Sequence, residues 1–381
     1  MFTPTVSAGT TPLLEHCKRA LDRGFQLGPH DLPLIGNGDW NDGMNLVGAE
    51  GRGESVWLGW FLCAVLESFA QIVEDRSNAA EAASTANKWR RQVAALKSAL
   101  EHSGWDGEWY LRAYFDNGSA LGSHANPEAR IDSMPQSWAV ISGAADPARA
   151  ARAMESADAN LVRERDRLVL LFTPPFDRSE PNPGYIRGYP PGMRENGGQY
   201  THGSLWMAMA WARLQQGGKA VRLLQLMNPI ESNRGPAEVA RYHGEPYVTA
   251  ADVYAASGRV GQSGWTWYTG SAAWMYRIWI EDVLGFRLRG DRFTMEPAIP
   301  ADWPGFELTY RHGSTVYEIT VIRHEEESAA LELDGEAVNF IQVEDTGQTH
   351  QVTVQLPRQL PGAPPAELLA AQDAAVHSGM T

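Results

Sequence analysis

The chain has 381 residues, of which 43% are hydrophobic and 20% charged, so it is long enough for a large core and two domains. Its formal net charge of −14 argues against a nucleic-acid partner, which requires a basic surface. The two cysteines, Cys17 and Cys63, lie in apolar helical contexts, so we expect reduced core thiols rather than a disulfide.

No stretch reaches the roughly eighteen uninterrupted apolar residues that a membrane helix needs, and the N-terminus lacks a signal-peptide pattern. We therefore expect a cytoplasmic protein without a membrane segment. The ten histidines are scattered and the cysteines are far apart, so no metal site is predicted. Neither a dinucleotide fingerprint nor a nucleophile elbow occurs, and no cofactor is expected.

Helical patterns fill the chain up to residue 284. After an irregular lead-in over residues 1–11, residues 12–25 form an amphipathic pattern with Leu14, Cys17 and Leu21 on one face. Further helices are expected over residues 54–75, 78–103, 130–142, 146–171, 202–216, 220–227, 249–257 and 271–284, and a short strand or hairpin over 107–114. Helix pairs recur without a fixed period, which favours a helix array or α/α toroid with functional loops at one end.

After residue 285 the pattern changes to alternating apolar and polar residues broken by glycine, aspartate and proline. Such alternation predicts strands joined by hairpins. The segments are 286–288, 292–295, 306–311, 316–323 and 329–333, with 352–356 as a further candidate. We expect a mainly α domain over residues 1–284, a β-sandwich or jelly-roll-like domain over 285–357, and a flexible tail over 358–381 with one short helix at 367–372.

Residues 38–45 read Gly-Asp-Trp-Asn-Asp-Gly-Met-Asn and lie in a loop rich in glycine and proline. They combine two carboxylates, Asp39 and Asp42, with the indole of Trp40 and the amide of Asn41. A sugar-cleaving site needs an aromatic plane, donors for hydroxyls and a carboxyl group that protonates the leaving oxygen. The alternative is a structural turn, because Asn-Asp-Gly favours turns and Asp often caps a helix.

A second loop, over residues 176–198, leads into the helix that begins near His202. Loops of this length inside a compact domain are usually functional. Helix N-termini attract anions, so His202 and Arg194 are candidate contacts to phosphate or sugar. The alternative is that His202 merely caps the helix and Glu195 pairs with Arg194.

A third loop reads Gly-Trp-Thr-Trp-Tyr-Thr-Gly-Ser over residues 264–271, again just before a helix. Thr269 and Gly270 supply a hydroxyl and accessible N–H groups that can hold an anion. An ordinary threonine cap with neighbouring core aromatics is the alternative.

These three loops, in this order, on helix pairs followed by a β domain, resemble glycoside hydrolase family 94. That family comprises inverting phosphorylases of cellobiose, chitobiose and 1,2-β-oligoglucans, and the phosphorylase-like C-terminal region of cyclic β-1,2-glucan synthases. The similarity extends over residues 14–323 and is carried by residues 38–45, 51–57, 194–202 and 267–270. The runs Gly-Arg-Gly-Glu-Ser and Arg-Glu-Asn-Gly-Gly-Gln-Tyr-Thr-His are most similar to the synthase and oligoglucan branch.

The resemblance implies a role for each matching residue. Asp42 corresponds to the general acid, whereas Asp39 is expected to be structural. His202, Thr269 and Gly270 match the phosphate-binding positions. The residues expected to contact sugar are Trp40, Asn41, Tyr185, Tyr189, Arg194 and Glu195. Arg194 stands where the cellobiose enzymes carry a lysine. Tyr185 stands where they carry a glutamate, and this difference indicates a changed acceptor subsite.

The resemblance also implies the mechanism. Phosphate attacks the anomeric carbon from the face opposite the leaving group while Asp42 protonates the glycosidic oxygen, so a β-glucoside yields α-glucose 1-phosphate. The expected partners are therefore inorganic phosphate as co-substrate and a β-glucan oligosaccharide. Asp42 must stay protonated near neutral pH, which requires desolvation or a nearby negative charge such as bound phosphate.

Two rival interpretations remain. In an inverting hydrolase, Asp42 would be the acid and Glu195 or Asp132 the base, with carboxyl groups roughly 6.5–9.5 Å apart. In an inactive fragment, the chain would only bind glucan or complete a partner.

The family's members are longer than this chain, because a β-sandwich and the first helices of an (α/α)6 barrel precede the acid motif. We therefore expect a C-terminal part of the barrel with exposed apolar helix faces. Its expected protein partner is a second copy or the N-terminal part of the barrel. A parent synthase could be anchored in the inner membrane.

Overall fold

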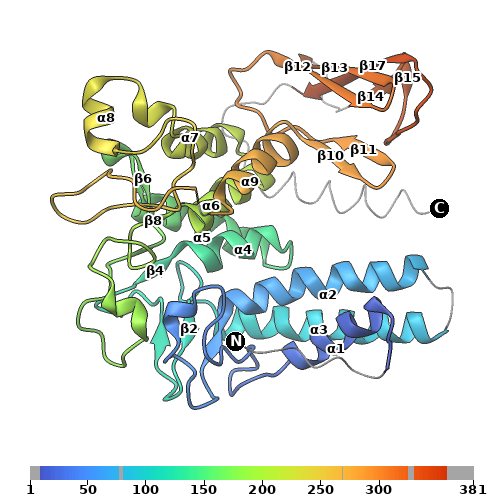
Figure 1. Ribbon diagram of the computed structural model, residues 1–381. Helices are drawn as coiled ribbons and strands as arrows, with labels where there is room; N and C mark the ends of the chain where they lie inside the picture. Colours follow the sequence, from blue (N-terminus) through green and yellow to red (C-terminus); the bar gives the residue numbers. More distant parts are fainter. Residues whose placement is uncertain (1–8, 77–79, 268, 325–329, 358–381) are drawn as a thin grey trace.

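The computed structural model describes residues 9–76, 80–267, 269–324 and 330–357. Helices dominate the described chain before residue 284 and strands dominate it afterwards, as Figure 1 shows. The mainly α region followed by a β region is thus as expected. Most of the expected lead-in, residues 1–8, and the expected tail over residues 358–381 with its short helix lie outside the described residues.

The helices pack largely in pairs. In the longest pair, α2 and α3 run antiparallel, with Gly59 against Leu100 and the ring of Phe69 6.4 Å from that of Trp89 (Figure 1). Further along, α4 packs on α6 and α6 on α7. The helices are α1 (Leu13–Gly24), α2 (Val56–Arg76), α3 (Ala80–Ser103), α4 (Ser133–Ile141), α5 (Pro147–Leu161), α6 (Thr201–Arg213), α7 (Gly217–Met227), α8 (Pro236–Tyr242) and α9 (Ser271–Arg277), the last continuing as a π-helical segment (Ile278–Val283).

Helix α6 forms the centre of the helical region. Every residue from Leu205 to Ala212 is buried, as expected for a helix that is apolar on all sides. Its N-terminal end carries His202, so a deeply buried helix positions one of the predicted site residues.

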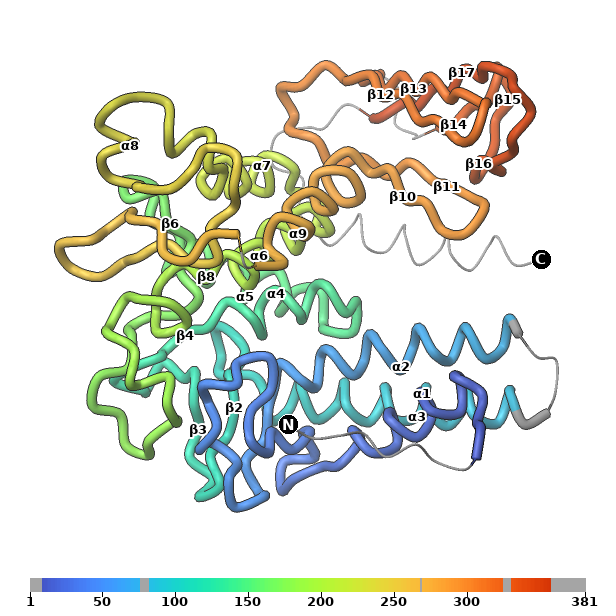
Figure 2. Tube along the Cα trace, in the orientation of Figure 1, coloured from blue at the N-terminus to red at the C-terminus, as the bar shows by residue number. Residues whose placement is uncertain are grey.

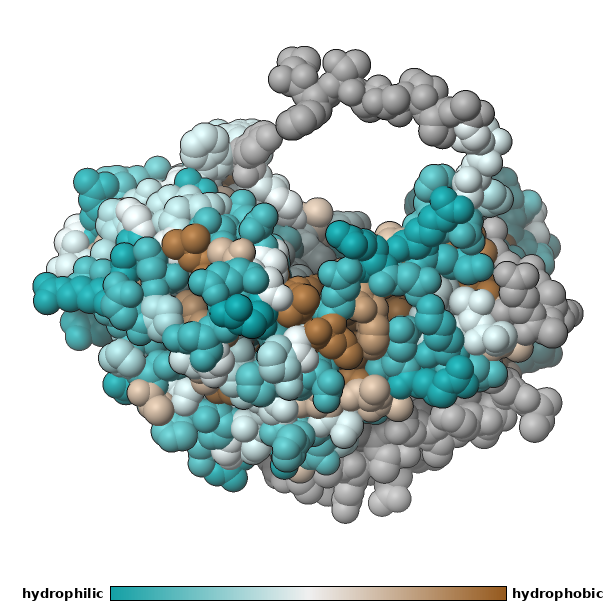
Figure 3. Space-filling model, turned by 90° about the horizontal axis from the view of Figure 1, so that it is seen from below, coloured by the Kyte–Doolittle hydropathy of each residue, from teal (hydrophilic) through white to brown (hydrophobic). Residues whose placement is uncertain are grey.

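Helix α2 is the one described helix that is long and apolar enough to cross a membrane, judged over Val56–Asp75 by length and composition alone. Half of that apolar window is buried inside the protein, where α2 packs against α3 and α4. The buried core helix of a soluble protein passes the same test of length and composition, so this finding is weak evidence for a membrane helix. The surface seen from below is mostly hydrophilic, with hydrophobic residues gathered near its middle (Figure 3).

Short antiparallel strand pairs hold the loops together at one end of the helices. The first part of the chain is joined to the segment after α3, as the neighbouring blue and cyan traces in Figure 2 show. The pairs are β1 (Glu54–Ser55) with β2 (Ala113–Tyr114), β2 with β3 (Ala120–Leu121), β4 (Ile131–Asp132) with β7 (Phe172–Thr173), and β8 (Gln199–Tyr200) with β9 (Asp252–Val253).

Two sequence-based helix predictions are wrong. The helix expected over residues 146–171 ends at Leu161, and β5 (Val162–Arg163) then pairs with β6 (Leu168–Val169). Two valines, Val162 and Val169, face each other in this pair, which suits β-branched side chains. The alanine-rich segment 249–257 forms β9 instead of a helix, because it pairs with Gln199–Tyr200. The sequence pattern also did not predict the short helix α8.

The C-terminal region contains two sheets. The first has the order β10-β11-β16 and the second the order β12-β13-β17-β14-β15. Phe293 of the first sheet is fully buried, with ring centroids 5.9 Å from Tyr310 and 5.5 Å from Tyr317 of the second, so the sheets face each other. The strands are β10 (Phe286–Arg289), β11 (Arg292–Met295), β12 (Gly305–His312), β13 (Thr315–His324), β14 (Ala330–Leu333), β15 (Glu336–Ala337), β16 (Ile341–Gln342) and β17 (Thr349–Pro357).

The expected strand over residues 352–356 is part of β17. It runs parallel to β13 and antiparallel to β14, so the β region is not built of hairpins alone. Gly285 marks the change from helix to strand. Its φ is +73°, and a side chain there would meet the backbone of Glu296 at 2.2 Å, so only glycine fits this turn.

Candidate active site

The loop that carries residues 38–45 ends in a single 3-10 turn, Asp42–Met44. The side-chain oxygen of Asn41 caps this turn by accepting the Gly43 backbone N–H at 3.2 Å. Asn41 is buried, and its Nδ2 atom has no hydrogen-bond partner among the described residues. The turn that the motif favours is therefore present, and it leaves an amide donor of Asn41 unused.

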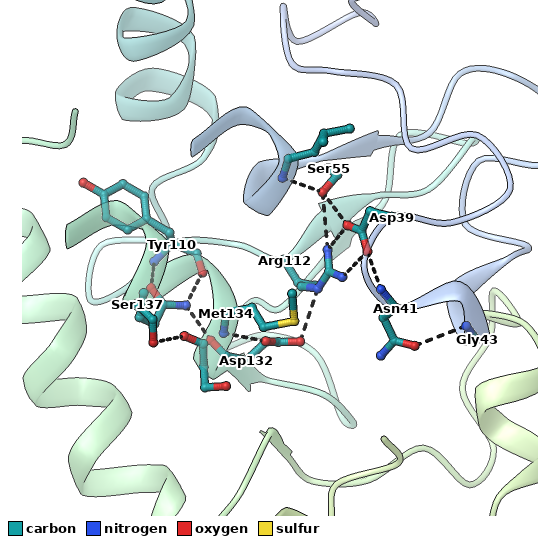
Figure 4. A network of polar contacts seen from close by, with 12 residues as sticks. Asp39, Asn41, Gly43, Ser55, Tyr110, Arg112, Asp132, Met134 and Ser137 are labelled. Carbon is teal, nitrogen blue, oxygen red and sulfur yellow. Dashed lines mark hydrogen bonds and ion pairs between the residues drawn. The ribbon is translucent and has the colours of Figure 1, made fainter. Parts of the chain in front are cut away.

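The first carboxylate of the motif, Asp39, is structural, as expected. The guanidinium of Arg112 binds it through two contacts, Nη1 to Oδ2 at 2.6 Å and Nη2 to Oδ1 at 2.7 Å (Figure 4). The hydroxyl of Ser55 donates to Oδ2 at 2.6 Å and the backbone N–H of Asn41 to Oδ1 at 3.0 Å. The side chains of Arg112 and Asp39 are 1% and 0% exposed.

The same guanidinium also reaches Asp132, whose Oδ2 lies 3.2 Å from Arg112 Nε. Asp132 caps helix α4 by accepting the N–H of Met134 at 2.8 Å. Burial raises the pKa of Asp132 to about 6, against the opposing effect of Arg112. Burial acts on Asp39 in the same sense, but Arg112 and the hydrogen bonds outweigh it and hold the pKa of Asp39 below its ordinary value. One buried cation thus joins the acid loop to helix α4.

The second carboxylate, Asp42, is exposed. It hydrogen-bonds with the hydroxyl of Tyr185, and burial together with this carboxylate raises the pKa of Tyr185. The backbone N–H of Tyr185 donates to Asn45 Oδ1 at 3.0 Å. Gly184 makes this approach possible, because its φ is +129° and an added Cβ would lie 2.4 Å from Asn45 Oδ1. The second loop therefore rests directly on the acid motif.

Side-chain contacts continue from Tyr185 through the second loop. The rings of Tyr185 and Tyr189 are 6.1 Å apart, and Arg194 lies 4.8 Å above the ring of Tyr189. Arg194 Nε is 3.4 Å from Glu195 Oε2, so the expected alternative of an Arg194–Glu195 pair is correct. Burial and the Glu195 carboxylate, which is hydrogen-bonded to the Tyr200 hydroxyl, raise the pKa of Tyr200 to about 12.

The contacts end at an aromatic cluster around His202. The ring of Trp40 lies 5.3 Å from Tyr200 and 5.5 Å from His202, and Trp274 lies 5.7 Å from His202 on another side. Burial lowers the pKa of His202 to about 4, so its imidazole is neutral at pH 7. The Nε2 atom of His202 is buried and has no hydrogen-bond partner among the described residues. His202 does not cap helix α6, which begins without a side-chain cap.

The third loop reaches the same cluster through helix α9. Thr269 Oγ1 accepts the backbone N–H of Ser271, the first residue of α9, at 3.0 Å. The N-cap residue itself is Gly270, which has no side chain to cap the helix, so Thr269 is not the N-cap that the alternative expected. Gly270 precedes the helix, and the space around its Cα is open. Trp274, one turn later, contacts His202. The structure therefore brings all three predicted loops together.

The comparisons with known proteins show the family of the chain. The profile of the glycosyl hydrolase 94 superfamily, catalytic domain, matches residues 2–285. The chain belongs to this superfamily. Its β region beyond residue 285 lies outside the matched part.

Several members of the superfamily are similar to the chain. Cyclic β-(1,2)-glucan synthase NdvB of Rhizobium meliloti (strain 1021) is 45% identical over 323 residues, which are 84% of this chain and 11% of that protein. Solabiose phosphorylase of Paenibacillus borealis is 31% identical over 93% of this chain and 46% of its own length. N,N'-diacetylchitobiose phosphorylase of Vibrio furnissii is 28% identical over 93% of this chain and 43% of its own length. The chain thus spans less than half of each of these relatives.

A solved structure described as a sialidase matches 78% of this chain and 26% of that chain, with a TM-score of 0.51 and 15% identity. This likeness concerns the fold alone.

Two residues that position the site were missed by the sequence analysis. One is Arg112, which lies between apolar residues in the run Trp-Tyr-Leu-Arg-Ala-Tyr-Phe. A buried arginine requires a carboxylate partner, so this context was a usable signal. The other is Asp252, which accepts the N–H groups of Arg194 and Trp265 and lies in the strand mistaken for a helix.

Within the described ranges, no three His, Cys, Asp or Glu side chains are grouped so that they could hold a metal ion.

Proposed function

We propose that the chain carries the acid and phosphate sites of an inverting phosphorylase that cleaves β-linked gluco-oligosaccharides with inorganic phosphate. The observation that carries this proposal is the continuity of the site. Exposed Asp42 and the unpartnered Nε2 of His202 are joined through Trp40 and the aromatic and charged residues of the second loop.

In the proposed reaction, Asp42 is the general acid. An oxygen of hydrogen phosphate forms a bond to the anomeric carbon, the bond from that carbon to the glycosidic oxygen breaks, and the proton of Asp42 moves to the departing oxygen. Asp42 regains a proton from the hydrogen phosphate that attacked, so the proton count balances. Attack from the face opposite the leaving group converts the β-linkage into α-glucose 1-phosphate.

Phosphate binding is assigned to His202, Thr269 and Gly270. A neutral imidazole can donate a hydrogen bond from Nε2, and the low pKa of His202 keeps it neutral over the working range of pH. The hydroxyl of Thr269 and the accessible backbone at Gly270 lie at the start of helix α9, where the helix dipole favours an anion. The phosphate would thus be held mainly by uncharged polar groups, and Arg194 would contact the acceptor sugar.

Sugar contacts are assigned to Trp40, Asn41, Tyr185 and Tyr189, with Arg194 and Glu195 at the acceptor side. The unused Nδ2 of Asn41 is a donor for a sugar hydroxyl. Tyr185 presents a half-exposed ring beside Asp42, where an acceptor sugar would lie. A β-1,2 linkage is proposed because the relative with 45% identity is a cyclic β-(1,2)-glucan synthase.

The hydrolase alternative receives no support from the geometry. Glu195 is engaged by Arg194 and Tyr200, and Asp132 is buried against Arg112 and the start of α4. Asp132 is therefore not free to activate water, and the Glu195 carboxylate faces a cation and a phenol, although its Oε2 accepts no hydrogen bond from the described residues. From the family membership we also propose that the helix pairs belong to an (α/α)6 barrel.

The experiment that tests the proposal is incubation of the protein with sophorose, with and without inorganic phosphate. Glucose 1-phosphate should form only with phosphate, and Asp42→Asn should abolish it. Asp177→Asn makes the same chemical change at an exposed carboxylate elsewhere in the second loop and should leave the rate unchanged. Equal product from Asp42→Asn and the parent would show that Asp42 is not the acid.

A further inference from the structure

Exposed aromatic side chains occur on the loops near the site and on helix α9. Among the described residues, those with large exposed rings in this region are Tyr185 (48%), Tyr247 (76%), Trp265 (61%), Trp267 (69%) and Tyr276 (68%). Single exposed apolar residues need no explanation, but a group of them marks a binding surface. Tyr185 already belongs to the proposed site, and the others have no assigned role.

Tyr247 and Trp267 form a pair within this group. Their ring centroids are 6.2 Å apart and the planes are inclined by 63°. The indole N–H of Trp267 donates to Glu245 Oε1 at 3.1 Å, which fixes the orientation of the exposed ring. One of two neighbouring exposed rings is therefore held in place by a specific hydrogen bond.

The backbone of Trp267 is strained. Its φ is +69°, a region that bulky residues rarely adopt and that costs about 1–3 kcal/mol. Glycine would fit this conformation without strain. An exposed tryptophan at a position that suits glycine indicates that the indole itself is needed there.

The aromatic pair is anchored to the active site through Asp252, which is 3% exposed. Its Oδ1 accepts the backbone N–H of Trp265 at 3.1 Å, and its Oδ2 accepts that of Arg194 at 3.2 Å. Trp267 follows Trp265 by two residues and precedes Thr269 by two. One buried carboxylate thus holds the loop of the aromatic pair beside the loop of the acceptor side.

We propose that Tyr247 and Trp267 form an additional sugar subsite, which binds the glucosyl units of a β-linked gluco-oligosaccharide beyond the two that flank the cleaved bond. This inference rests on the proposed function, because it extends the same site. The apolar C–H face of a glucosyl ring packs on an aromatic plane, and the carboxylate of Glu245 accepts its hydroxyls. A carboxylate within the pair suits a hydroxyl-rich ligand better than an apolar protein surface, where its burial would be unfavourable.

The test measures binding of β-1,2-linked gluco-oligosaccharides of two and five units by calorimetry, without phosphate. The pentasaccharide should bind the parent about tenfold more tightly than the disaccharide, a difference of about 1.4 kcal/mol. Trp267→Ala should remove this difference and leave disaccharide affinity unchanged. Trp267→Gly should do the same and fold at least as stably as the parent. Phe340→Ala removes an exposed ring from the β region and serves as the matched control.

Equal affinity for both lengths, or an unchanged pentasaccharide affinity in both Trp267 variants, would overturn the inference. A shift from dimer to monomer in these variants, with pentasaccharide affinity unchanged, would show that a second copy covers the rings. Release of glucose 1-phosphate from the disaccharide, which does not reach Trp267, tests the proposed function separately. Loss of that reaction with the length effect intact would reject the phosphorylase proposal and retain the subsite.

Discussion

Replacing Arg112 with methionine tests the buried cluster that supports the acid loop. The substitution keeps an unbranched side chain but removes two contacts to Asp39 and one to Asp132. Both carboxylates then remain buried without a cation. Removing one partner of a buried ion pair costs about 3–5 kcal/mol, and two orphaned carboxylates place the expected loss at the upper end of that range.

The assay is denaturant unfolding of the parent and Arg112→Met at pH 7 and pH 5. The loss should be smaller at pH 5, because the carboxylates that no longer face a cation take up protons more readily as the pH falls. Arg152→Met breaks a surface pair with Glu108, whose partners are 56% and 54% exposed, and should cost less than about 1 kcal/mol. If Arg112→Met also costs less than about 1 kcal/mol, the cluster does not stabilise the fold.

Three further predictions concern the site. His202 has a pKa of about 4 in the folded protein and about 6.5 when unfolded, so its stabilising effect is complete above pH 6.5 and is lost as the pH falls. His202→Gln should therefore remove up to about 2 kcal/mol of the loss in unfolding free energy between pH 7 and pH 5. Gly184→Ala should destabilise the protein by about 1–3 kcal/mol in thermal or denaturant unfolding, because the added methyl would lie 2.4 Å from Asn45 Oδ1 at a φ of +129°. Tyr185→Phe should lower the rate of glucose 1-phosphate formation from sophorose by about tenfold or less, because it removes the hydroxyl that is hydrogen-bonded to the Asp42 carboxylate.

Matched variants separate these effects from general damage. His312→Gln changes an exposed histidine of β12 and should keep the pH dependence of the parent. Gly188→Ala adds a methyl to the same loop where the space is open and should be neutral. The interpretations of His202 and Gly184 fail if these controls behave like the test variants. The role given to Tyr185 fails if Tyr185→Phe leaves the rate of glucose 1-phosphate formation unchanged.

Much of the helical region could be predicted because its helices carry local signals. The expected helix over residues 12–25 is α1 to within a residue at each end. Aspartates cap α4 and α5 directly before their first residues. The alternation after residue 285 likewise predicted strands, since period two is a property of the segment itself.

The errors arose where distant residues decide the structure. Segment 249–257 is rich in alanine, which favours a helix locally, but Asp252 and Val253 pair with a strand some fifty residues earlier. The contact between Arg112 and Asp39 spans 73 residues, and no local pattern shows it. The exposed position of Trp267 was also not predicted, because its aromatic neighbours suggested core packing. It depends on the hydrogen bond to Glu245.

The most direct test of the phosphorylase proposal is the anomeric configuration of the product, followed by proton and phosphorus NMR during reaction of sophorose with phosphate. The proposed inverting mechanism, with Asp42 as the acid, predicts α-glucose 1-phosphate that appears only when phosphate is present. Free glucose formed at the same rate without phosphate, or β-glucose 1-phosphate, would contradict an inverting phosphorylase.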